Sequence, residues 1–258
     1  MWFGIMGSLL VCDGDVVVDV PAPRQRALLA ALLVRAGREV PVDELAEIVW
    51  DGSPPTRPAA TLRTHVMRLR RVLGRGPGGR LVTRYPGYRL NAGEDEVDLL
   101  RFVALCREGG TAVRAGAWAR ASGVLAEALG LWRGAPLADI PSQMLQCREL
   151  PPLQQLRLQA LEWQADAELR LGGHAELVPG LRCLAADHPL RERFHAQLML
   201  ALYRCGRQAE ALAAYQSARR VLIGELGIEP GDELRELHRR ILAADPALTS
   251  PAGIPIGA

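Results

Sequence analysis

The residues best suited to binding chemistry lie in a segment whose apolar spacing predicts a helix over residues 59–73. Four apolar residues follow one another at steps of 4, 3 and 4, which places them in one buried stripe. They are Leu62, Val66, Leu69 and Leu73. The opposite face and its flanks hold Thr61, Arg63, Thr64, His65, Met67, Arg68, Arg70 and Arg71. Because a guanidinium group can donate two hydrogen bonds to guanine or pair with phosphate, this face has the chemistry of a helix that reads the major groove of DNA.

Charge is distributed unevenly along the chain. Residues 52–93 contain nine Arg and no acidic residue, although the whole chain has 31 basic and 29 acidic residues and a net charge of +2. Residues 1–93 have a net charge of +5, from 13 Arg and 8 acids, and residues 94–258 have −3, from 18 Arg and 21 acids. A long basic stretch is what a phosphate-facing surface requires, since a merely solvated face usually carries interspersed acids. The near-neutral total therefore does not exclude a nucleic-acid partner.

The segments that precede this helix predict strands and two further helices. Apolar runs over residues 5–11 and 16–20 flank Asp13-Gly14 and predict two strands joined by a tight turn. Two helices and an irregular, proline-rich stretch are then predicted over residues 23–36, 42–50 and 51–58.

The segment that follows the helix predicts a hairpin over residues 80–90. Pro86-Gly87 suits the centre of a type II turn, which places Arg84 near the tip. Helix, helix, reading helix and basic hairpin form a winged helix. Its Arg84 would enter the adjacent minor groove, whose negative potential attracts guanidinium.

The second half, residues 97–245, reads as nearly all helix. Residues 171–177 and 205–211 align at an offset of 34, the period of the tetratricopeptide repeat (TPR), and a looser copy at Gly116 precedes by 56 residues. An inserted connection is predicted over residues 132–144, and a disordered tail over residues 246–258. The chain is therefore predicted to be mainly α with a small β component, a winged helix followed by an all-α TPR-like domain. An Ala-rich helical bundle without true repeats is the alternative for the second half.

Several enzyme classes are excluded by composition. The chain has no Lys, which rules out a phosphate-binding GK[ST] loop, a Schiff-base lysine and a kinase-type catalytic lysine. Its five cysteines never form CxxC, and its histidines show no ligand spacing, so neither a disulfide framework nor a metal site is predicted. Gly74, Gly76 and Gly79 match GxGxxG, but the match follows a helix and precedes a strand, the reverse of a dinucleotide-binding motif.

These exclusions predict a protein that is not an enzyme and that needs no cofactor. No apolar run reaches the roughly 18 residues that span a bilayer, and no leader is recognised at the start, so a cytoplasmic, nucleoid-associated protein without membrane contact is expected.

Several segments resemble a known family. In the first half, residues 23–30, 45–50, 65–71 and 86–88 resemble the OmpR/PhoB-type winged helix, and more specifically that of the Streptomyces antibiotic regulatory proteins (SARPs). In the second half, residues 190–192, 202–212 and 225–231 are similar to the family's bacterial transcriptional activation domain. The resemblance implies a DNA-binding domain over residues 1–93 and an activation domain over residues 97–245.

The resemblance also implies roles for individual residues. His65 would contact a phosphate, Arg68 would read a base, Thr61 and Thr64 would lie at the groove, and Arg84 would enter the minor groove. The complete expected DNA-binding set is Thr61, Arg63, Thr64, His65, Arg68, Arg71 and Arg84. Met67 stands where several relatives carry a polar or basic residue, so one phosphate contact is expected to be missing. No receiver domain precedes the winged helix, so switching by phosphorylation of a receiver is not implied.

By the same resemblance, the partners would be double-stranded DNA and RNA polymerase including its sigma factor, with a homodimer at least on DNA. The expected function is transcriptional activation from direct repeats near the −35 region of antibiotic and other secondary-metabolite promoters. The alternative is a TPR-type adaptor whose basic N-terminal domain binds an acidic partner other than DNA.

Overall fold

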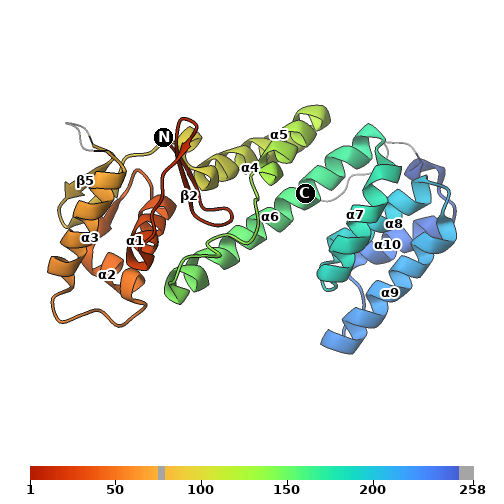
Figure 1. The fold of residues 1–258 in the computed structure, drawn as a ribbon. Helices are drawn as coiled ribbons and strands as arrows, with labels where there is room; N and C mark the ends of the chain where they lie inside the picture. The colour runs from red at the N-terminus through yellow and green to blue at the C-terminus, as the bar shows by residue number, and fades with distance from the viewer. Residues whose placement is uncertain (75–78, 250–258) are drawn as a thin grey trace. The chain divides into compact units, whose positions relative to one another are not determined.

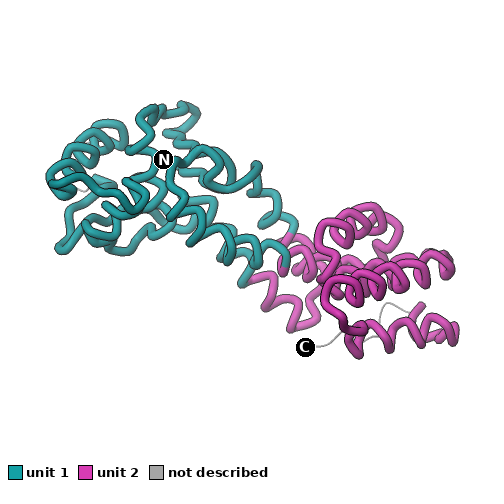
Figure 2. Tube along the Cα trace, turned by 90° about the horizontal axis from the view of Figure 1, so that it is seen from below, with its two compact units in different colours: residues 1–107, 126–158 teal, residues 108–125, 159–258 magenta. Residues whose placement is uncertain are grey.

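The computed structural model describes residues 1–74 and 79–249 of the chain. Its described part is mainly helical with two small sheets, which confirms the fold class expected from the sequence (Figure 1). The chain forms two compact units, coloured separately in Figure 2: residues 1–107 with 126–158, and residues 108–125 with the chain from 159 onward. These units are defined by contacts within the chain and do not coincide with residues 1–93 and 97–245. The division into domains with those bounds therefore stays a prediction.

Three helices form the body of the first unit: α1 (Pro23–Val34), α2 (Val42–Trp50) and α3 (Pro58–Val72). α1 and α3 each begin with a proline, whose missing N–H would have had no partner in the first helical turn. α1 is buried on nearly all sides, and α2 and α3 both pack against it. The predicted helices over residues 23–36, 42–50 and 59–73 are therefore confirmed, with α1 two residues shorter and α3 one residue earlier.

In the described part of the chain, six short strands form two three-stranded antiparallel sheets. The first has the order β1 (Trp2–Gly4), β2 (Leu10–Asp13), β3 (Val16–Val17), and the second β4 (Glu39–Pro41), β6 (Gly87–Leu90), β5 (Leu81–Arg84). The predicted turn at Asp13-Gly14 joins β2 to β3, where Asp13 pairs with Val16. The predicted strand over residues 5–11 is wrong for residues 5–9, and that over residues 16–20 ends at Val17.

The backbone of residues 5 and 6 is held by a buried carboxylate instead of a neighbouring strand. Asp98, which is completely buried, accepts hydrogen bonds at 2.9 Å from the backbone N–H groups of Ile5 and Met6. Its partner set also includes the Leu99 N–H at 2.8 Å and the Arg133 guanidinium at 3.2 Å. The Asp98 side chain, more than 90 residues away in the sequence, therefore takes the place of the strand-to-strand hydrogen bonds that the apolar run alone would favour.

The chain then passes through η1 (Glu94–Glu96), α4 (Asp98–Arg114), α5 (Trp118–Gly130) and the long α6 (Gln143–Leu171). The predicted connection over residues 132–144 corresponds to a segment without α-helix over residues 131–142. The start of α6 is fastened to the winged helix: the Ser142 hydroxyl donates to the Ile48 carbonyl at 2.8 Å, and Glu149 pairs with Arg35 at 2.7 Å. Residues 126–158 are for this reason part of the first unit.

The second unit continues with α7 (His174–Asp187), α8 (Glu192–Arg204), α9 (Gln208–Leu226) and α10 (Asp232–Leu242). The predicted repeat falls on its turns. Gly116, Gly172 and Gly206 lie between successive helices, and each has a positive φ, of 67°, 95° and 74°, that glycine adopts without strain. In each turn the next residue donates its N–H to the carbonyl five residues earlier. α8 packs against both α7 and α9, as consecutive helices of a helical repeat do.

The end of the described chain is ordered, which corrects one expectation. Residues 246–249 were expected to belong to a disordered tail, yet η2 (Pro246–Leu248) is formed and Leu248 is completely buried. The Arg204 guanidinium donates to the Leu248 carbonyl at 2.8 Å, which fixes this turn against α8. The rest of the predicted tail, residues 250–258, lies outside the described residues.

Candidate nucleic-acid interface

The candidate reading helix α3 is anchored by its apolar stripe. Leu62, Val66 and Leu69 are buried in the core of the first unit, and Leu73 is buried just after the helix ends. The structure places the expected side chains of this helix on its outer side or at its border. Arg63, Thr64, Arg68 and Arg71 are exposed, whereas Thr61 and His65 are half-buried. α3 thus presents a row of guanidinium and hydroxyl groups to solvent.

The arginines of the acid-free stretch fall into two groups. Three have structural partners: Arg70 bonds to β5, Arg80 pairs with Glu96 at 2.7 Å, and Arg89 donates to Asn91 at 2.9 Å. Within the described part of the chain, the others form no ion pair, and all are exposed: Arg57, Arg63, Arg68, Arg71 and Arg84. Arg75 lies outside the described residues. Five guanidinium groups without a counter-charge therefore concentrate on α3, the residue before it and the hairpin.

The hairpin of β5 and β6 forms the wing. Arg84 pairs with Gly87, so the two turn residues are Tyr85 and Pro86, joined by a cis peptide bond as in a type VI turn. The predicted type II turn centred on Pro86-Gly87 is therefore wrong, although Arg84 does lie beside the tip. The Tyr85 side chain is 96% exposed and is a surface feature of the wing tip that the sequence reading missed.

Two contacts fix the wing to the helical body. Arg70 of α3 donates from Nε to the Leu81 carbonyl at 2.9 Å and from its terminal nitrogen to the Thr83 hydroxyl at 2.8 Å. On the other side β6 pairs with β4, and Gly87 lies so close to Val40 that no side chain would fit there. Arg70 is therefore a positioning residue for the wing. Its place on the flank of α3 was visible in the sequence, but the partner strand was not.

His65 lies at the border between the exposed face of α3 and the core. Burial lowers the pKa of its imidazole below the usual value, and the nearby positive charges of Arg68 and Arg24 lower it further. Its Nδ1 atom is buried and has no hydrogen-bond partner among the described residues. The ring edge lies against Trp50, with the ring centroids 6.1 Å apart. A neutral imidazole beside two cations is suited to accept a proton when a phosphate approaches, because the phosphate would offset their repulsion.

Among residues 1–74 and 79–249, no group of three His, Cys, Asp or Glu side chains is placed to hold a metal ion. Within the same ranges, no helix combines the length and apolar character needed to cross a membrane.

A winged helix joined to helical-repeat pairs, with a basic reading helix and wing, defines a class of transcriptional regulators. Comparison with known proteins agrees with this class. Residues 20–90 match the family described as the C-terminal part of transcriptional regulatory proteins, and residues 97–242 match the bacterial transcriptional activator domain. The chain belongs to the SARP family of transcriptional activators, which confirms the resemblance noted in the sequence.

Individual relatives differ in how much of them the chain represents. The regulatory protein DnrI of Streptomyces peucetius is 36% identical, and the match covers 96% of this chain and 94% of DnrI. The regulatory protein AfsR of Streptomyces griseus is 42% identical over 98% of this chain, but the chain spans only 26% of AfsR. A solved structure of Mycobacterium tuberculosis EmbR, in complex with a low-affinity phosphopeptide, superposes with a TM-score of 0.89 at 35% identity and covers 95% of this chain and 65% of EmbR. These names denote transcriptional regulators rather than enzymes.

Proposed function

We propose that the chain activates transcription by binding direct repeats near the −35 region of its target promoters and recruiting RNA polymerase, including the sigma factor. The observation that carries the proposal is the set of five exposed guanidinium groups without acidic partners on and beside α3 and at the wing. By similarity to DnrI and other regulators of this family, the targets are genes for antibiotics or other secondary metabolites.

The proposed contacts divide by element. α3 lies in the major groove, where Arg68 reads a base, Arg63 and Arg71 meet phosphates, and Thr61 and Thr64 line the groove. His65 donates to a phosphate from Nε2, because its Nδ1 is buried. The wing carries Arg84 into the adjacent minor groove. The protein would act in the cytoplasm, where it would associate with the nucleoid.

The first prediction concerns base reading. Arg68→Ala should weaken binding to the cognate promoter fragment by about 1–3 kcal/mol and leave binding to random DNA nearly unchanged, because a bidentate base contact contributes only at the right sequence. Fluorescence anisotropy on a footprinted fragment and on a random one measures both affinities. Arg38→Ala is the matched control, since Arg38 is exposed and directly precedes β4, whose first residue pairs with Arg89 and not with the wing tip. Equal losses on both DNAs would contradict base reading by Arg68.

The second prediction concerns the wing. Arg84→Ala should weaken binding to all sequences and reduce the slope of log K against log salt by about 0.9, the value for one released counterion. A titration between low and moderate salt measures the slope for the wild type, Arg84→Ala and Arg38→Ala. An unchanged slope in Arg84→Ala would place this side chain away from the DNA.

Activation and stoichiometry are tested separately. Displacing one half-site by half a helical turn should abolish cooperative binding of two copies, because protein contacts across direct repeats require both copies on one face of the duplex. Run-off transcription with purified polymerase measures recruitment. If no promoter fragment is bound better than random DNA at moderate salt, the activator proposal fails and the adaptor function is favoured.

A further inference from the structure

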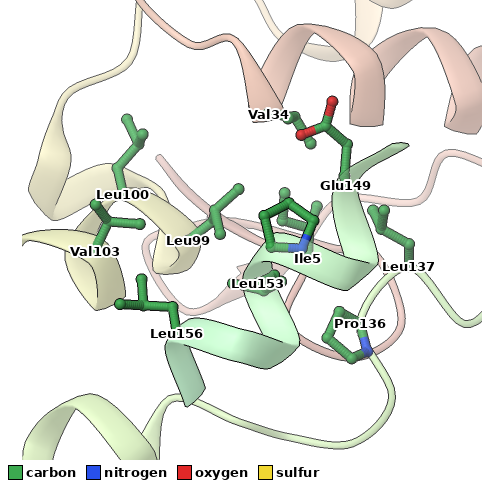
Figure 3. Close-up of a pocket in the computed structure, with 11 residues that line it drawn as sticks. Ile5, Val34, Leu99, Leu100, Val103, Pro136, Leu137, Glu149, Leu153 and Leu156 are labelled. Carbon is green, nitrogen blue, oxygen red and sulfur yellow. The ribbon is translucent and has the colours of Figure 1, made fainter. Parts of the chain in front are cut away.

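The first unit contains an apolar cavity of about 230 Å³, shown in Figure 3. Its walls come from the end of α1, the first turns of α4, the connection over residues 131–142 and the middle of α6. The lining residues are Ile5, Val34, Leu99, Leu100, Val103, Pro136, Leu137, Glu149, Pro152, Leu153 and Leu156. All of them belong to the first unit, so the cavity lies within one compact body.

The cavity is open to solvent and its walls are incompletely covered. Val103 is 45% exposed, and Leu99 and Leu156 are half-buried. In Figure 3 the side chains of α4 stand on one side and Leu153 and Leu156 of α6 on the other. Apolar surface left in water carries a free-energy cost of about 25 cal/mol per Å². A molecule that covers these aliphatic walls would remove that cost.

The polar groups at the border determine the charge of the occupant. Glu149 is the charged residue of the lining, and it is already paired with Arg35 at 2.7 Å and lies 3.6 Å from Arg148. The hydrogen bond with Glu149 raises the pKa of Arg35, so this guanidinium stays charged beside the carboxylate. A charged occupant would find no free counter-charge among these groups. The cavity is therefore suited to an uncharged molecule.

A proline ring forms part of the α6 wall of the cavity. Pro151 and Pro152 lie inside this helix, and Pro152 contributes to the lining. Because proline has no N–H, the carbonyl group four residues earlier, that of Arg148, lacks its helical donor. Arg148 is not among the lining residues, so this part of the cavity wall is the apolar ring of Pro152.

We propose that this cavity binds a small, uncharged, largely aromatic or branched aliphatic molecule. Its volume sets the size, since a cavity of about 150 Å³ holds one benzene ring in another protein. A cavity of about 230 Å³ suits a molecule larger than one ring. Such a molecule would bridge α1, α4 and α6 and would stabilise the first unit by mass action.

The test uses N-phenyl-1-naphthylamine, a neutral aromatic amine with one N–H whose fluorescence rises in apolar surroundings. The wild-type chain should bind it saturably with one site, and its unfolding temperature should rise with probe concentration. Val103→Trp should weaken binding at least about tenfold, a difference of about 1.4 kcal/mol, because the indole occupies the space of the probe. Leu156→Glu should do the same by placing a carboxylate on the wall. Val17→Trp is the matched control, since Val17 is 65% exposed in the same unit but outside the cavity.

Circular dichroism checks that each variant folds. If Leu156→Glu does not fold, the probe affinity of Val103→Trp alone tests the site. Loss of probe affinity in the folded cavity variants, with Val17→Trp unchanged, supports the site. Wild-type affinity in either folded cavity variant, or an equal loss in Val17→Trp, overturns it. The readout is independent of DNA, so failure of this site and failure of the proposed function are distinguishable.

Discussion

Replacement of Gly87 by alanine tests whether the wing must stay paired with the helical body. A Cβ at this position would lie 1.8 Å from the carbonyl oxygen of Val40 and 2.8 Å from the Cα of Pro41. Both are backbone atoms, and real Cβ atoms essentially never come closer than 3.0 Å to a neighbour. β6 must therefore move away from β4 by more than an ångström, which disrupts the pairing at the base of the wing.

The expected cost follows from this clash. Overpacking a well-packed site destabilises by about 1–3 kcal/mol. For a chain of this size each kcal/mol lowers the unfolding temperature by about 2–4 °C, so a fall of about 2–12 °C is expected. The folded protein would persist at 25 °C with a displaced wing. We therefore expect Gly87→Ala to lose at least as much DNA affinity as Arg84→Ala, because the whole tip is shifted with the guanidinium group.

Differential scanning calorimetry measures the unfolding temperature, and anisotropy at 25 °C measures DNA affinity. Gly93→Ala is the matched control, since a Cβ there meets no atom within 4 Å and the φ of −92° suits alanine. If Gly87→Ala matches Gly93→Ala in both measurements, β4 does not hold the wing. A loss of stability without loss of affinity would show that the wing is not needed for binding.

Two further predictions concern a titrating side chain and a buried one. The pKa of His65 is lowered in the free protein and should rise next to a phosphate, so DNA binding should be coupled to proton uptake and strengthen as the pH falls from 7.5 towards 6. Anisotropy at fixed salt should show this dependence in the wild type and in His238→Gln but not in His65→Gln, and an equal dependence in all three would remove His65 from the phosphate. Asp98→Ala should cost about 3–5 kcal/mol in urea unfolding because it leaves buried N–H groups and a guanidinium unpaired. Asp95→Ala, at an exposed position, should cost little, and a loss below about 1 kcal/mol in Asp98→Ala would contradict the role of that carboxylate.

Local patterns were sufficient to predict the helices of the winged domain and its exposed face. α2 is found at the predicted bounds because its apolar positions, Leu45, Ile48 and Val49, repeat at helical spacing and meet one core. The apolar residues of α3 also repeat at helical spacing and meet the core, so the arginines on the opposite face are exposed. The left-handed glycine turns of the second unit were also visible, as a 34-residue repeat.

Features that depend on distant partners were not predictable from local patterns. The apolar run at residues 5–9 resembles a strand, but its backbone donors meet Asp98, which no local pattern connects to them. Arg70 has the same side-chain chemistry as Arg71, yet it is directed to β5 and not to solvent. The wing turn is centred on Tyr85-Pro86 and not on Pro86-Gly87, because Arg84 pairs with Gly87, and residue types alone do not specify that register.

The composition of the first unit has a consequence for synthesis of the chain. Leu137, Ile140 and Leu145 belong to the same apolar cluster as the core side chains of the winged helix. The domain that carries α3 and the wing therefore cannot complete its core before these residues have been synthesised. At about 5–20 residues per second, that takes roughly 3–10 s after residue 93 has been made. The reading surface is thus translated early but folds to completion late, together with the first part of the activator domain.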